Sequence, residues 1–291
     1  MEPPEIEHYQ TLLELAKQED LGRGDITSEV TIGLDESGSG KLVFREAGVL
    51  CGIPVAAEVL RHYSEHLAMK DVKSDGTYIP AGTAAATIQG PLRSLLSAER
   101  VLLNFLQRLS GIATKTAQFV EAIQGTRAKI YDTRKTTPGW RALEKYAVRC
   151  GGGCNHRQGL YDAVLIKDNH LVHQAPGNLK ERLEAVIVRI QERSPRPAFI
   201  EVEADRLEQL AEVLEVKGVD MVLLDNMPPA KLSEAVRLRD QICTDREVAL
   251  EASGGITLET VRAVAETGVE RISVGALTHS VRSLDIGLDV E

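Results

Sequence analysis

The sequence predicts a two-domain protein of the α/β class, in which the second domain is an α/β barrel. At 291 residues, the chain is long for a single compact core. In its second part, short apolar runs alternate with amphipathic helical patterns, which is typical of βα units that build a parallel sheet. Polar residues or glycines follow these runs directly. An open, doubly wound sheet is the alternative arrangement of the same units.

The first 120 residues are expected to form a mixed α/β region. A long helix is predicted from near Ser97, because its apolar residues recur every three or four positions and define one buried face. Gly111 lies within this pattern and is expected to interrupt or bend the helix. Strands are expected at residues 41–50 and 83–88, and a further helix at residues 7–19.

The second part of the chain contains six apolar runs, each expected to be a strand. Six strands with their helices favour a closed barrel. The runs are residues 128–131, 163–166, 198–202, 221–224, 248–250 and 271–274. The helical patterns between them are residues 179–192, 206–214, 229–242 and 258–267.

Polar residues or glycine stand at the end of each of these runs. In α/β barrels, functional groups lie at the carboxyl ends of the strands, so these residues are expected to converge on one mouth. The alternative for any single one of them is that it only reaches solvent. The residues are Asp132, Lys167, Glu203, Asp225, Glu251 and Gly275.

Composition and charge exclude several classes of protein. A net charge of -9 and a pI near 5.4 argue against general binding to nucleic acid or to an anionic membrane. No apolar run approaches the roughly 20 residues that a membrane span needs. The acidic N-terminal residues lack the pattern of a secretory signal, and the four cysteines are scattered. We therefore expect reduced thiols and a cytoplasmic protein.

Residues 134–157 carry a local excess of positive charge. Their net charge is +5 within a chain of -9, which suits a small multivalent anion such as a dicarboxylate. For Arg141 and Lys145 we favour a solvated helix face. Four cations flank strand ends and glycines and are predicted to belong to a binding site: Arg134, Lys135, Arg157 and Lys167.

Glycines within and after the cationic segment indicate close approach of a ligand to the backbone. Cys150 and Cys154 flank three of them, with His156 nearby, and this leaves a zinc site as a weak alternative because the spacing is not that of a zinc knuckle. Two later glycine turns follow the last two strands, where barrels often bind phosphate. These turns are Ser253-Gly254-Gly255 and Val274-Gly275-Ala276.

Three carboxylates near the predicted mouth offer a second kind of chemistry. Glu201 and Glu203 alternate along one strand and therefore point to the same side. Together with Asp225 they are able to hold Mg²⁺, contact sugar hydroxyls or stabilise a developing positive charge. The alternative is a structural ion pair with Lys167 or Arg157.

These motifs together resemble the quinolinate phosphoribosyltransferase family. The most specific is DTRKTTPGWRALEKYAVRCGGGCNHRQGLYDAVLIKDNH at residues 132–170. Shorter ones are EDLGRGDITSE (19–29), AERVLLNFLQRLSGIAT (98–114), EVE (201–203), LLDNM (223–227), EASGGI (251–256) and SVGALTHS (273–280). The resemblance runs from about residue 19 to residue 287 in one order.

The resemblance implies a fold and a reaction. The fold is an N-terminal α/β sandwich domain followed by an incomplete, seven-stranded α/β barrel. We assign residues 1–120, rejoined by 280–291, to the first domain and residues 121–279 to the barrel. Six strands are visible in the pattern, and the seventh is not located. The reaction transfers phosphoribose from phosphoribosyl pyrophosphate to quinolinate with Mg²⁺, giving nicotinate mononucleotide, pyrophosphate and carbon dioxide in NAD biosynthesis.

The resemblance also implies roles for individual residues and a shared site in a homodimer or higher assembly. Lys135, Glu203 and Asp225 are expected to be catalytic, and the last two to serve the ribose and the metal. The acid and sugar are expected to contact Arg100, Thr133, Arg134, Lys135, His156, Arg157, Lys167, Glu203 and Asp225, with Arg100 donated by a second subunit. The phosphate is expected at Ser253, Gly254, Gly255, Val274, Gly275, Ala276 and His279.

Two other functions remain open from the residues alone. A related phosphoribosyltransferase would use a monocarboxylic pyridine without decarboxylation, although the crowded cations favour two carboxylates. A phosphometabolite-binding barrel would sense its ligand without reacting. Glu203 and Asp225 argue against this second alternative, because an anion binder gains nothing from carboxylates beside its ligand.

Overall fold

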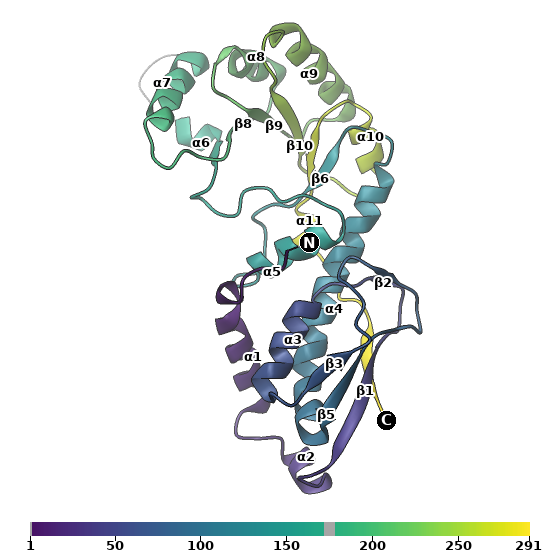
Figure 1. Cartoon of the computed structure of the whole chain (residues 1–291). Helices are drawn as coiled ribbons and strands as arrows, with labels where there is room; N and C mark the ends of the chain where they lie inside the picture. The colour runs from purple at the N-terminus through teal and green to yellow at the C-terminus, as the bar shows by residue number, and fades with distance from the viewer. Residues whose placement is uncertain (1, 172–177) are drawn as a thin grey trace. The chain divides into compact units, whose positions relative to one another are not determined.

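The computed structural model describes residues 2–171 and 178–291, which form two compact units (Figure 1). The first comprises Met1–Ala117, Lys135–Gly153 and Leu277–Glu291, and the second Gln118–Arg134 and Cys154–Ala276. The segment Lys135–Gly153 therefore packs with the first unit, although it lies within the predicted barrel domain. None of the helices among the described residues has the length and apolarity needed to cross a membrane.

The first unit is built on a four-stranded antiparallel sheet in the order β12-β1-β5-β3. The C-terminal strand pairs with β1 from Gly40 opposite Val290 to Phe44 opposite Ile286, so both ends of the sequence contribute to this sheet. The strands are β1 (Ser37–Phe44), β3 (Ala68–Lys70), β5 (Ala84–Pro91) and β12 (Ile286–Val290), with a separate pair of β2 (Gly48–Val49) and β4 (Tyr78–Ile79).

Helices of the first unit bury one apolar face each. In α3 (Ile53–Tyr63), a proline near the first position starts the helix, and Val55, Val59 and Leu60 are buried at helical spacing. Asp75 accepts from the first backbone amides of this helix at 2.9 and 3.1 Å. The other helices are η1 (Ile6–His8), α1 (Gln10–Leu21), α2 (Ile26–Thr31), α4 (Leu92–Ala122) and α5 (Arg141–Cys150).

Gly111 was expected to interrupt or bend the long helix, and the interruption is wrong, because α4 runs unbroken from Leu92 to Ala122. The glycine serves packing instead. A Cβ atom at this position would lie 2.2 Å from the backbone oxygen of Arg282 and 3.3 Å from the backbone nitrogen of Leu284. Gly111 therefore allows the C-terminal segment to lie directly against α4.

We expect Gly111→Ala to lower the free energy of unfolding by about 1–3 kcal/mol, the range for forcing a methyl group into a filled site. Intrinsic helix propensity alone predicts the opposite sign, since alanine is the better helix former. Urea unfolding measures the change, with Asn104→Ala at an exposed position of the same helix as the control. An unfolding midpoint for Gly111→Ala at or above that of the parent would contradict the packing role.

The second unit contains the predicted parallel sheet, which confirms the α/β class. Its six strands lie in the order β6-β11-β10-β9-β8-β7, and every pairing is parallel. Beyond β6, Tyr131 forms a single parallel bridge with Cys154, where a seventh strand would begin. The strands are β6 (Lys129–Tyr131), β7 (Val164–Ile166), β8 (Ile200–Ala204), β9 (Met221–Asp225), β10 (Ala249–Ser253) and β11 (Arg271–Ser273).

Helices connect these strands as expected for βα units (Figure 1). The predicted helix at residues 258–267 is shorter than expected, because Thr257 and Thr260 hydrogen-bond to each other in a turn and the helix starts only at Val261. The helices are α6 (Asp168–Leu171), α7 (Leu179–Gln191), α8 (Leu207–Glu215), α9 (Pro229–Ile242) and α10 (Val261–Ala265), followed by α11 (Ala276–His279).

Candidate active site

The carboxyl ends of the parallel strands carry most of the predicted site residues of the second unit. Asp132 follows β6, Lys167 follows β7, and Asp225 is the last residue of β9. The last residue of β10, Ser253, pairs in register with Asp225, so these two strands end side by side. Because the strands are parallel, their carboxyl ends lie along one edge of the sheet.

Two arginines of this unit lie near each other. Burial lowers the pKa of Arg157, and the positive charge of Arg134 lowers it further. The Nε atom of Arg134 is buried and has no hydrogen-bond partner among the described residues, while one terminal nitrogen of Arg157 lies 3.4 Å from the backbone oxygen of Ala163. Neighbouring guanidinium groups with an unused buried donor form a site suited to an anion.

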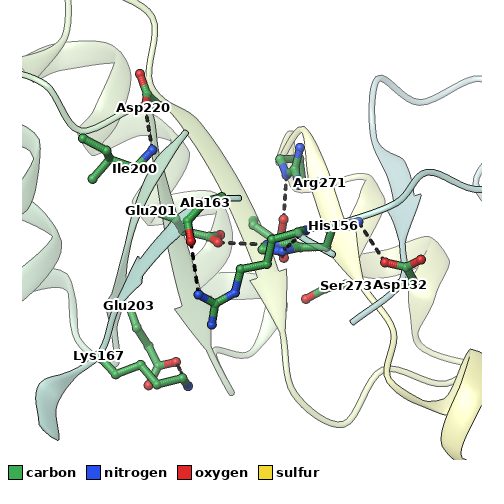
Figure 2. Close-up of polar contacts among 12 residues, drawn as sticks. Asp132, His156, Ala163, Lys167, Ile200, Glu201, Glu203, Asp220, Arg271 and Ser273 are labelled. Carbon is green, nitrogen blue, oxygen red and sulfur yellow. Dashed lines mark hydrogen bonds and ion pairs between the residues drawn. The ribbon is translucent and has the colours of Figure 1, made fainter. Parts of the chain in front are cut away.

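A buried network lies at the centre of the sheet (Figure 2). The Nε2 atom of His156 lies 2.9 Å from Glu201 Oε2 and 3.4 Å from Glu251 Oε1. Arg271 pairs with the other oxygen of Glu251 at 2.6 Å, and its guanidinium stacks on the ring of Tyr131 at 3.5 Å. Both carboxylates are fully buried. Burial raises the pKa of Glu201 to about 7, and burial followed by the charge of Glu201 raises the pKa of Glu251.

Glu251 does not end its strand, contrary to the expectation from the sequence. The strand β10 continues for two residues beyond it to Ser253, so its side chain belongs to the interior of the sheet. Glu203 likewise lies within β8, one residue before its end. Glu201 and Glu203 share a face as predicted, but Glu201 is buried beside His156 and Glu203 is partly exposed beside Lys167.

Three carboxylates form a candidate site for a divalent cation. Glu203, Asp205 and Asp225 each place one oxygen within 4.8 Å of the others. Oxygen donors of this kind suit Mg²⁺, so the residues fit the metal. Glu203 also pairs with Lys167 (Figure 2), which is the ion pair considered as an alternative above. Asp205 was not predicted, although it continues the alternation of Glu201 and Glu203 toward the same side.

The loop after β10 adopts a backbone that only glycine accommodates readily. Gly254 and Gly255 have φ values of +98° and +62°. A Cβ atom on Gly254 would lie 2.1 Å from Asn226 Oδ1, and the backbone N–H of Asn226 donates to Ser253 at 2.8 Å. The loops after β9 and β10 therefore contact each other, which brings Asp225 close to the predicted phosphate turn. After β11, Val274 donates its N–H to Tyr131 at 2.9 Å.

Three further predicted residues belong to the first unit: Arg100, Lys135 and His279. The Arg100 side chain is 59% exposed and lies 3.9 Å from the neighbouring Glu99. Lys135 is exposed, and its backbone oxygen accepts from Thr278 Oγ1 at 2.7 Å. His279 Nδ1 lies 2.6 Å from Ser280 Oγ.

The loop that carries Lys135 is anchored by residues to which we assigned no role. Arg108 on α4 pairs with the fully buried Glu144 of α5 and also donates to Thr137 Oγ1 at 2.7 Å. Glu144 in turn accepts from the backbone N–H of Thr137 at 3.2 Å. In the sequence, Glu144 counts only as one negative charge in a basic segment, so this anchoring role is not visible there.

The cysteines considered for zinc have other neighbours. Cys150 lies with Cys51 and Asp75 in the first unit, with one ligand atom of each within 4.8 Å of the others. His156 lies with Glu201 and Glu251 in the second unit. All four cysteines are free thiols.

Comparison with known proteins identifies the family of this chain. The sequence profiles of the N-terminal and C-terminal domains of quinolinate phosphoribosyl transferase match residues 25–110 and 112–289. The carboxylating nicotinate-nucleotide pyrophosphorylase of Mycobacterium leprae is 46% identical over 280 residues, covering 94% of each chain. The probable enzyme of Bacillus subtilis is 43% identical over 272 residues, covering 94% of this chain and 90% of the relative.

A solved structure shows the same fold over the full length. The nicotinate-nucleotide pyrophosphorylase from Francisella tularensis superposes with a TM-score of 0.89 at 36% identity, covering 99% of this chain and 98% of the other. Both domain profiles, the curated relatives and this structure agree with the resemblance seen in the motifs. The chain belongs to the quinolinate phosphoribosyl transferase family.

Proposed function

We propose that the carboxyl-end edge of the parallel sheet is where this chain carries out the reaction of its family. The chain is a decarboxylating phosphoribosyltransferase: it transfers phosphoribose from phosphoribosyl pyrophosphate to quinolinate and releases pyrophosphate and carbon dioxide. The observation that supports this location is the pair Arg134 and Arg157, with an unused buried donor on Arg134. A dicarboxylate placed beside the two guanidinium groups relieves the repulsion between the two cations.

Glu203 and Asp225 are the residues we assign to the ribose and to Mg²⁺. As the C1–pyrophosphate bond breaks, positive charge develops on the ribose, and carboxylates beside it lower the energy of that state. Asp205 completes a set of oxygen donors able to hold Mg²⁺. When bound there, Mg²⁺ supplies positive charge to the pyrophosphate that leaves.

Decarboxylation follows from the charge of the product ring. Attack by the ring nitrogen of quinolinate on the ribose gives a pyridinium cation, whose charge stabilises the electron pair left on the ring carbon when the adjacent carboxylate departs as carbon dioxide. That carbon then takes a proton from water, which gives nicotinate mononucleotide. The basic groups need only hold and orient the acid. In addition to the two arginines, we assign Thr133, Lys135, His156 and Lys167 to this acid site.

The remaining assignments concern the phosphate, the assembly and the location. We assign the sugar phosphate to Ser253–Gly255, Val274–Ala276 and His279, because the glycine turns leave backbone amides open to an anion. We assign Arg100 to the site of a second copy in a homodimer or larger assembly, since it is exposed within its own chain. We also propose a cytoplasmic location, which suits four free thiols.

Replacing Arg134 with leucine is expected to weaken quinolinate binding by about a hundredfold, since losing one partner of a buried charge contact costs roughly 2–5 kcal/mol. Calorimetric titration with quinolinate alone measures the change. The matched control is Arg237→Leu, which removes an exposed arginine from α9 and should leave binding unchanged. Equal weakening by both substitutions would show that net charge, and not this site, governs binding.

A further inference from the structure

Both ring nitrogens of His156 are engaged by the protein itself. Nδ1 lies 2.8 Å from the backbone N–H of Arg157, which donates to it. Nε2 lies 2.9 Å from Glu201 Oε2 and 3.4 Å from Glu251 Oε1. The backbone N–H of His156 donates to Asp132 Oδ1 at 2.8 Å. The imidazole side chain is only 7% exposed.

These contacts define the protonation of the ring. A backbone amide is always a donor, so the nitrogen that accepts from Arg157 carries no proton. A neutral imidazole then has its proton on Nε2, where Glu201 Oε2 accepts it at 2.9 Å, while Glu251 Oε1 lies 3.4 Å away. His156 is therefore a neutral bridge from the interior of the sheet to the backbone of Arg157.

One of the two carboxylates, Glu251, is also held by an arginine. Arg271 holds Glu251 at 2.6 Å and is held in turn by stacking on Tyr131. One oxygen of Glu201, one of Glu251 and one terminal nitrogen of Arg271 are buried without a hydrogen-bond partner among the described residues. The network thus has few alternative partners within the protein, and loss of one contact is not readily replaced.

We propose that Glu201 and Glu251 are positioning residues for the acid substrate, acting through His156 to fix the backbone that carries Arg157. In this arrangement the His156 ring is neutral, and the backbone contact fixes the orientation of Arg157 toward the substrate. The inference rests on the proposed role of Arg157 in holding quinolinate. It adds two buried carboxylates to the groups on which acid binding depends, and it specifies that His156 serves the acid site by holding the backbone of Arg157.

A purely structural role for these carboxylates makes a different prediction. In that case, replacing Glu201 would lower the free energy of unfolding, but the molecules that remain folded would bind each substrate as tightly as the parent protein does. If the carboxylates position Arg157, replacing them should weaken the binding of quinolinate and not that of the phosphosugar, because the phosphosugar is assigned to other loops. Glu270 provides a matched control, since this carboxylate pairs with Arg239 at 3.1 Å and accepts from the backbone of Leu250 at 2.8 Å, before the amino end of β11.

The experiment compares Glu201→Leu, Glu201→Gln and Glu270→Leu in steady-state kinetics with both substrates varied. Glu201→Leu removes the acceptor, and KM for quinolinate should rise about tenfold, the size of one lost hydrogen bond. KM for phosphoribosyl pyrophosphate should stay within about twofold, which is below the effect of one hydrogen bond. Glu201→Gln, which keeps an acceptor oxygen, should restore most of the affinity, and Glu270→Leu should leave both KM values unchanged.

Nitrogen NMR of the histidine rings in the parent protein supplies a readout that needs no activity, with His156 assigned by comparison with His156→Asn. We expect Nδ1 to be unprotonated and Nε2 to carry the proton. A doubly protonated ring, a proton on Nδ1, or equal KM changes for the two substrates would overturn the inference. Absence of activity in the parent would instead overturn the proposed function, and the NMR result would still decide the state of His156.

Discussion

Asp225→Asn and Glu203→Gln are each expected to lower kcat by about a hundredfold, roughly 3 kcal/mol of transition-state stabilisation. Both substitutions keep the shape of the side chain and remove its charge. The charge matters most when the ribose becomes cationic, so the interaction is stronger in the transition state than in the bound substrate. The KM values should therefore change much less than kcat.

Steady-state kinetics with both substrates varied separates the effect on kcat from the effect on the KM values. Glu234→Gln is the matched control, because this carboxylate pairs with Lys231 at 2.9 Å on the surface helix α9. Glu203→Gln also leaves Lys167 without its carboxylate partner, so Asp225→Asn is the cleaner of the two tests. A change confined to KM would contradict the proposed role of these carboxylates in bond breaking.

Arg100→Ala is expected to fold normally and to lose nearly all activity. The side chain is exposed and touches only the neighbouring Glu99 among the ion pairs of the described residues, so its removal leaves no buried group unpaired. If Arg100 completes the site of a second copy, the variant should lose activity while its free energy of unfolding stays unchanged. Circular dichroism and thermal unfolding check that the variant remains folded.

Mixing provides the decisive test of a shared site. Arg100→Ala and Lys135→Ala are each inactive in this account, but a hybrid dimer of the two contains one intact site. With random exchange, half of the dimers are hybrids and half of their sites are intact, so about a quarter of the parent activity should return. No recovery after verified subunit exchange would contradict donation of Arg100 by a second subunit.

The regular part of the fold was predictable because its signals are local. Each of the six apolar runs forms a strand of the parallel sheet. The hydrophobic pattern of neighbouring residues is enough to distinguish short buried strands from the amphipathic helices between them. The bounds shifted where a charged residue is buried inside a strand. Residues 248–250 were expected to end before Glu251, whereas β10 continues past this glutamate to Ser253.

Residues that act through others were missed for a physical reason. Arg271 has no neighbour in the sequence that explains its burial, because its partners Glu251 and Tyr131 come from other strands. Glu144 was counted only as a charge, because its partner Arg108 lies 36 residues away on another helix. Contacts of this kind depend on tertiary packing, which local pattern and propensity do not contain.

The role of Gly111 also depends on a tertiary contact that the local sequence does not contain. A glycine within a helical pattern lowers helix propensity, so an interruption was the expected outcome. The reason for the glycine is the backbone oxygen of Arg282, which returns from the other end of the sequence to lie against α4. The glycine at position 111 is thus explained by a contact with residues far away in the sequence, and not by the conformation of the helix.

The most direct measurement of the central claim is the stoichiometry of the reaction. Purified protein is mixed with quinolinate, phosphoribosyl pyrophosphate and Mg²⁺, and carbon dioxide, pyrophosphate and nicotinate mononucleotide are measured together. We expect the three products to form in equal amounts, none to form without phosphoribosyl pyrophosphate, and nicotinate not to replace quinolinate. Pyrophosphate release without carbon dioxide, or turnover of nicotinate at a comparable rate, would contradict it.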